Sequence, residues 1–265
     1  MAQQRDVAWE HVVDTGPPER FLTLRKNLTG ACRVHPGGRL ATQAVDRLDE
    51  QTRHLHADME REAAALLSAT TAEEYQRYLA RTYGFIAPLE RCLLDTAGLD
   101  PYLDDRRLRK HLLIEHDLQA LGLRALELQS IPQCMWIPWF DNPFSALGWA
   151  YIIERMTLDH PNLFRHIATT LPGEAAFAAS FLKAYAGTTH EMWQSFASGI
   201  ELASAEPGNY ELVLDGARAG YRYFKRWRNT IDGKALSGPH TPTGEQAPLA
   251  REAEDVTPTS VVEDA

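Results

Sequence analysis

The chain has 265 residues, of which 44% are hydrophobic and 24% are charged. These are the proportions of a soluble globular protein with one sizeable core. No apolar run reaches the ~18 residues of a membrane-spanning helix, and the first six residues lack the apolar stretch of a secretory signal. The formal net charge of −9 argues against general nucleic-acid binding, which needs a basic face. We therefore expect a cytoplasmic protein.

The two ends of the chain differ in composition from its middle. Residues 1–37 hold Gly and Pro breakers around a weakly apolar stretch, and they predict an N-terminal arm. Residues 229–265 are rich in Pro and Gly, and from Thr241 onward they carry six acidic residues and one basic residue. Such a segment buries too little apolar surface to fold, so we expect a disordered acidic tail suited to a protein partner. The predicted folded domain is 38–228.

The three cysteines are far apart and form no paired motif. Cys32, Cys92 and Cys134 cannot all pair with one another, so we expect reduced thiols in a reducing compartment. Their expected role is that of small buried apolar groups.

The first two predicted elements of the domain are helices. Apolar residues recur at spacings of three and four from Val45 to Leu66, which predicts one helix with His56 on its buried stripe and His54 off it. Thr71 and Glu74 then form a capping box, which predicts the start of a second helix.

The remaining elements are also predicted to be helical. Asp104 is positioned to cap a third helix, and three prolines within 129–143 predict a loop. A helix is expected over 145–157, and a short one follows Pro161 to about 170. Long helices are expected over 174–203 and 207–228. No strand pattern appears, so the predicted fold class is all-α, a multi-helical bundle.

The segment from Leu48 to Glu60 resembles the proximal helix of the heme oxygenases. In that family a Thr stands four residues before the iron-binding His, and a carboxylate often stands four residues after it; Thr52, His56 and Glu60 have this spacing. Three further segments resemble the bacterial, phytochrome-associated branch: 75–90, 116–122 and 146–154, the last like the start of its distal helix. The resemblance covers roughly 40–228 and implies a heme-oxygenase-like bundle.

The resemblance also implies a chemistry. Heme would be both cofactor and substrate, held through its iron by His56, with Thr52, Glu60 and Tyr151 around it. The family cleaves heme to biliverdin, iron and carbon monoxide, using oxygen and electrons from a reductase. The protein's tasks in that reaction are ligation, orientation and a distal pocket for oxygen.

Two parts of the chain depart from the family pattern. After Glu154 the family's distal helix continues as Gly-Ser-Thr-Leu-Gly-Gly, whose glycines let the backbone touch the heme. Arg155, Asp159 and His160 fill those three glycine positions here, and the first two are then the distal candidates for a catalytic role. Burying unpaired charge is costly, although Arg155 and Asp159 could pair with each other. They would still occupy the space for oxygen, so we expect impaired or absent turnover.

The second departure is Asp49, seven residues before His56, where the family usually has an Arg or Lys facing a heme propionate. Arg47, Arg53 or the basic cluster of Lys225, Arg226 and Arg228 could compensate, although that cluster is equally typical of a solvated helix end.

Three alternatives remain open. The protein could be a non-catalytic sensor or interaction module that binds heme or a bilin, a pseudoenzyme of the family. His160 could supply a second iron ligand and give a bis-histidine heme. Asp49 and His56 also have the acid-x6-His spacing of non-heme di-iron oxidases in the same superfamily, although the sequence around His190 lacks the partner element.

Overall fold

The computed structural model describes residues 43–235, with backbone alone for 231–235. The predicted arm, which contains Cys32, lies outside these residues, and so does nearly all of the predicted tail. Within them the chain is helical and has no strand, so the predicted all-α class is confirmed. The helices are α2 (Gln43–Thr52), η1 (Arg53–Leu55), α3 (Ala57–Leu67), α4 (Ala72–Leu94), η2 (Asp105–Arg107), α5 (Lys110–Ala120), α6 (Ala125–Gln129), α7 (Pro143–Met156), α8 (His160–Thr170), α9 (Pro172–Phe177), α10 (Thr189–Ala203) and α11 (Asn209–Ala235).

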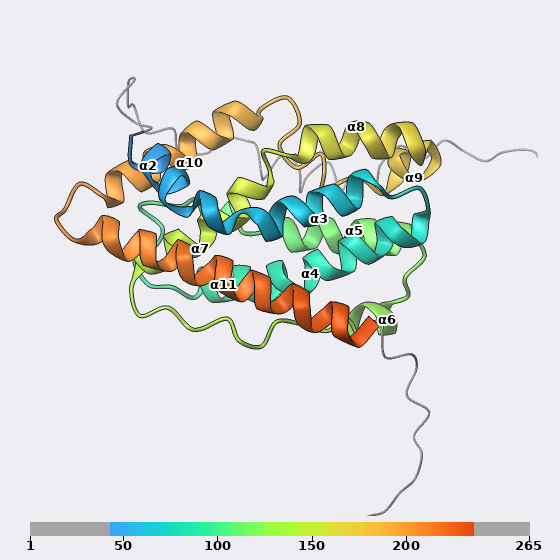
Figure 1. Cartoon of the computed structure of the whole chain (residues 1–265), viewed down its shortest axis with the longest axis horizontal. Coiled ribbons are helices and arrows are strands. Elements are labelled where there is room, and N and C mark those ends of the chain that lie inside the picture. The colour runs from blue at the N-terminus through green and yellow to red at the C-terminus, as the bar shows by residue number, and fades with distance from the viewer. Residues whose placement is uncertain (1–42, 236–265) are drawn as a thin grey trace, which may run out of the picture.

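The longest helix, α11, runs along the front of the bundle in Figure 1, with α2 and α3 lying above it. It packs chiefly on α7, and also on α2 and α4. Glycines bring α7 and α11 together: a Cβ at Gly148 would collide with the backbone of Val213, and one at Gly216 with the backbone of Ser145. The two backbones are thus in direct contact, which fixes the position of α7 in the bundle.

The start of α4 matches its prediction. The Thr71 hydroxyl accepts a hydrogen bond from the backbone N–H of Glu74, and the Glu74 carboxylate accepts one from the backbone N–H of Thr71. This satisfies two of the donors that a helix start leaves unpaired. Tyr75 and Leu79 follow on the buried face and join the core.

Three predicted boundaries differ from the structure. The single helix expected from Val45 to Leu66 is broken by the 3-10 turn η1, just before His56. Asp104 caps η2 through the backbone N–H of Arg106, and α5 begins only at Lys110. A short helix, α6, precedes the expected loop.

The expected helix over 174–203 is wrong. The chain leaves the helix at Ala178 and resumes only with α10. The cause is the buried carboxylate of Asp117 on α5, which accepts hydrogen bonds of 2.8 Å from the backbone N–H groups of both Ser180 and Phe181. These bonds hold the intervening segment against the core in a non-helical path. At the C-terminal end, α11 continues to Ala235, past its expected end at 228.

Candidate functional site

His56 lies at the joint between α2 and α3. The turn η1 separates the two helices, and His56 stands between this turn and the first residue of α3. Its side chain is buried, with 4% of the residue exposed, whereas His54 in the same turn is exposed. The break in the helix therefore keeps the expected placement of both histidines.

The imidazole of His56 is held by Thr52. The Thr52 hydroxyl donates to the backbone carbonyl of Leu48, 2.8 Å away, and its oxygen lies 3.1 Å from Nε2 of His56. With its own proton engaged, this oxygen accepts the hydrogen bond from Nε2–H. Burial lowers the pKa of His56 below its usual value, and the charge of Asp49 only partly opposes this. A neutral imidazole follows, which is the metal-binding form of histidine.

Aromatic packing from α11 covers the other side of the ring. The rings of His56 and Tyr221 have centroids 5.1 Å apart, and Tyr221 is itself buried. Burial raises the pKa of Tyr221, so its hydroxyl stays protonated. Nothing in the local sequence pattern could have paired these residues, which come from opposite ends of the domain.

Asp49 joins the two helices that would enclose a heme. Its Oδ1 accepts a hydrogen bond of 2.9 Å from the Tyr151 hydroxyl and one of 3.1 Å from Nε of Arg155. Asp49 belongs to α2, whereas Tyr151 and Arg155 belong to α7. Burial raises the pKa of Tyr151, which keeps it a donor, and Asp49 holds the pKa of Arg155 above normal although burial opposes this. We call this set of three residues the Asp49 bridge.

These contacts decide how well the residues fit a heme. On the proximal side the fit is good, because His56 is buried, neutral and placed next to Thr52. On the distal side the Asp49 bridge and Tyr221, whose ring packs against both His56 and Tyr151, occupy the space between α2 and α7. A heme would therefore find its iron ligand in place, but its macrocycle needs α2 and α7 to separate.

The other predicted site residues are placed as follows. Glu60 is exposed, and it acts on the site only through its negative charge, which raises the pKa of His56 slightly against the larger effect of burial. Asp159 is half-buried, and burial raises its pKa against the opposing charge of Arg155. The pair considered between Arg155 and Asp159 is replaced by the one between Arg155 and Asp49. His160 lies elsewhere, buried edge-on against Phe181 at 4.5 Å between ring centroids.

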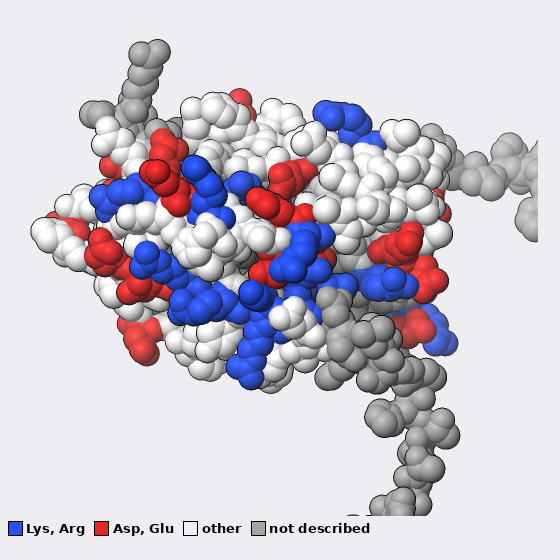
Figure 2. Space-filling view, in the orientation of Figure 1, with Lys and Arg blue, Asp and Glu red and all other residues white. Residues whose placement is uncertain are grey.

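Basic side chains form a row across the face shared by α11 and the α2–α3 segment (Figure 2). Some of those named as compensation for Asp49 have other contacts. The guanidinium of Arg226 lies 4.0 Å from the Trp136 ring centroid, and Arg228 pairs with Glu62 at 2.5 Å. The guanidinium of Arg47 stacks on a tyrosine ring of α11. Acidic side chains lie among the basic ones on this face (Figure 2).

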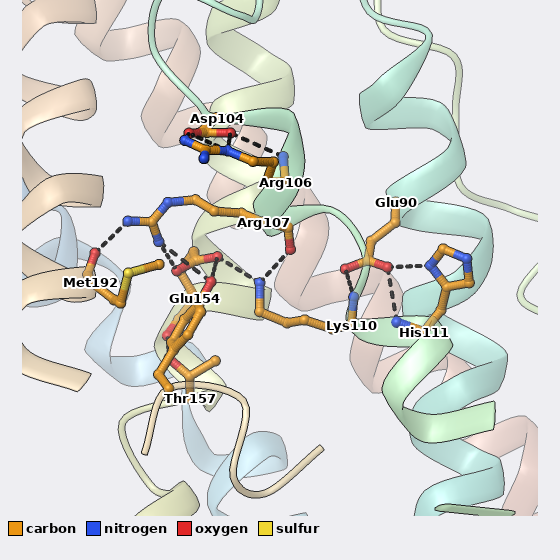
Figure 3. A network of polar contacts seen from close by, with 10 residues as sticks. Glu90, Asp104, Arg106, Arg107, Lys110, His111, Glu154, Thr157 and Met192 are labelled. Atoms are coloured by element: carbon orange, nitrogen blue, oxygen red, sulfur yellow. Dashed lines mark hydrogen bonds and ion pairs between the residues drawn. The ribbon is translucent and has the colours of Figure 1, made fainter. Parts of the chain in front are cut away.

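A buried ionic network surrounds Glu154 of α7 and was not foreseen (Figure 3). Glu154 pairs with Arg107 at 2.6 Å and with Lys110 at 2.8 Å, and it accepts a hydrogen bond from the Tyr185 hydroxyl. Burial alone would raise the pKa of Glu154, but the charges of Lys110 and Arg107 outweigh it and lower the pKa. A lone acid within the apolar run of α7 was the signal for such a network, because a buried carboxylate needs a partner.

Side chains are described for residues 43–230. Among these side chains, no three His, Cys, Asp or Glu residues gather closely enough to hold a metal ion, so no ligand set for the di-iron alternative lies in this part of the chain. No helix in that stretch is long and apolar enough to cross a bilayer. Cys92 and Cys134 are free and buried.

Comparisons with known proteins agree with this fold. A family model described as heme oxygenase matches residues 42–230. The heme oxygenase of Neisseria meningitidis, solved with NO and CO bound, matches with a TM-score of 0.59 and 19% sequence identity, over 77% of this chain and 98% of that chain. Among curated proteins, none matches the chain significantly.

Proposed function

This chain belongs to the heme oxygenase family, and from that premise we propose that it binds heme through His56 without cleaving it. The observation that carries the proposal is the Asp49 bridge. It replaces the open, glycine-lined distal side of the family with an ion pair between α2 and α7. The function is then that of a heme- or bilin-responsive binding protein. The space between α2 and α7, which we call the slot, is closed by the bridge when no ligand is bound.

The proximal residues support binding. Bound heme would supply the redox-active iron, and this chain's own residues would hold and orient it. His56 contributes a neutral nitrogen, and Thr52 fixes its ring by accepting a hydrogen bond. The free thiols of Cys92 and Cys134 suit a reducing compartment such as the cytoplasm.

The distal residues argue against turnover. Arg155 fills a position where the family has glycine, and its guanidinium is directed to Asp49 rather than to solvent. Oxygen activation needs free volume beside the iron, and a side chain tied across that volume removes it. Cleavage to biliverdin, iron and carbon monoxide, with electrons from a reductase, is the second candidate function. Its support is the family match and the buried His56.

Hemin titration of the full-length protein, followed by reduction in air, tests the proposal. We expect a saturable Soret shift that is lost in His56→Ala and kept in His54→Ala, a matched control because His54 is exposed in the same turn. After ascorbate is added, the Soret band should persist without a biliverdin spectrum. Biliverdin formation would show the second candidate to be right. No Soret shift would refute heme binding and leave a protein-interaction module of the same fold.

A further inference from the structure

A cavity of about 170 Å³ lies between the start of α8 and the segment that leads into α10. It is separate from the His56 site, because its walls come from His160, Pro161 and Phe164 on α8 and from residues 182–189 on the other side. Most of this lining is apolar. Its volume is close to the ~150 Å³ that accommodates a benzene molecule in a protein interior.

His160 is the unusual member of this wall. It is 3% exposed, and neither ring nitrogen has a hydrogen-bond partner of normal geometry among the described residues. Buried polar groups without a partner are rare in folded proteins, and each calls for an explanation. Burial and the nearby charge of Lys110 together lower its pKa to about 3, and the charge of Glu154 and the Phe181 backbone oppose this only in part. The imidazole is therefore neutral, with one donor and one acceptor to offer.

The other polar groups of the wall are already engaged. The Tyr185 hydroxyl donates to Glu154 at 3.1 Å, and the Thr189 hydroxyl donates to the backbone carbonyl of Tyr185 at 3.0 Å. Phe164 is held by the ammonium group of Lys183, 4.8 Å from its ring centroid. The cavity thus combines an apolar wall with one side chain, His160, that has no hydrogen-bond partner of normal geometry among the described residues.

We propose that this cavity binds a small neutral molecule of about benzene size that carries one hydroxyl group, and that the hydroxyl bonds to His160. Neither ring nitrogen reaches the cavity surface in the structure. A half-turn of the imidazole about its Cβ–Cγ bond exchanges nitrogen and carbon positions, and we infer that this turn presents a nitrogen to the ligand. A charged ligand is disfavoured, because an ion loses its hydration in an apolar cavity and finds no counter-charge among the uncommitted groups.

The test uses phenol and benzene as probes of equal shape that differ in one hydroxyl. Binding to the full-length protein is followed by the ring resonances of ¹³C-labelled histidine and by ligand-detected NMR. We expect saturable binding of phenol that shifts the His160 resonances, and an affinity for phenol roughly three- to tenfold above that for benzene, the worth of one neutral hydrogen bond. The proposal does not depend on heme binding, so hemin is absent throughout.

His160→Phe keeps the ring and removes both nitrogens, so it should erase the preference for phenol while benzene still binds. His190→Phe is the matched control, because His190 is exposed and lies outside the cavity wall; it should leave the preference intact. Phe164→Trp fills the cavity and should abolish binding of both probes, which keeps the test decisive if His160→Phe fails to fold. The proposal is overturned by an unsaturable phenol response, by an unchanged preference in His160→Phe, or by unaltered binding in Phe164→Trp.

Discussion

Replacing Asp49 with Ala removes the Asp49 bridge and should strengthen heme binding. The side chains of Arg155 and Asp49 are 24% and 33% exposed, so solvent screens their ion pair and limits its worth to at most about 1 kcal/mol. The hydrogen bond from Tyr151 adds about 1 kcal/mol net. If these contacts must break before heme enters, the cost of opening is about 1–2 kcal/mol, and its removal tightens hemin binding by roughly 5- to 30-fold.

Soret titrations of the wild type and Asp49→Ala measure this difference as a ratio of dissociation constants. Glu50→Ala is the control, because Glu50 is an exposed acid on the same helix and its loss changes the net charge equally. It should change the hemin affinity by less than about twofold, an effect of long-range charge alone. Equal affinities in Asp49→Ala and the wild type would refute the reasoning that this bridge closes the slot.

Three further predictions concern stability. The pKa of His160 is about 3 in the folded state against a usual value of 6.5. As the pH falls, the unfolded chain therefore takes up a proton at this residue first, and the free energy of unfolding should fall by about 2 kcal/mol between pH 7 and about pH 5. Denaturant unfolding at the two pH values should show a smaller loss in His160→Phe. Gly148→Ala should destabilise the fold by about 3 kcal/mol, measured by thermal unfolding, because its methyl group meets the backbone of Val213; a near-wild-type melting temperature would contradict the close helix packing. Glu154→Gln removes the carboxylate that pairs with Arg107 and Lys110 in the buried network, and it should lower the free energy of unfolding in urea by about 3–5 kcal/mol. A change below about 1 kcal/mol would mean that water reaches the network.

Local patterns in the sequence predicted the features that depend on neighbouring residues. The capping box of α4 formed as expected because Thr71 and Glu74 satisfy backbone groups within one turn. The burial of His56 was also predictable, since its stripe of apolar neighbours survives the break at η1. Such features require no knowledge of which helices meet.

Features that depend on distant residues were not predictable from those patterns. The residues 178–181 read as helix, but Asp117, more than sixty positions earlier, offers their backbone N–H groups a buried carboxylate that competes with helical hydrogen bonds. The contact of Tyr221 with His56 likewise depends on how α11 crosses the joint between α2 and α3. Propensity is a weak guide wherever a tertiary partner of this kind is present.

The two departures from the family pattern are best explained as one change. Taken singly, Asp49 puts a negative charge where the family has a cation, and Arg155 puts a cation where the family has a glycine. The structure brings the two together at 3.1 Å, so each supplies the counter-charge that the other needs.

The two substitutions should therefore be coupled: Asp49→Lys alone sets like charges side by side, and Arg155→Gly alone leaves Asp49 without its cation. The double variant Asp49→Lys/Arg155→Gly should be more stable than the sum of the two single effects predicts, by about 1 kcal/mol in a double-mutant cycle measured by urea unfolding. Additive effects would mean that the two positions diverged independently.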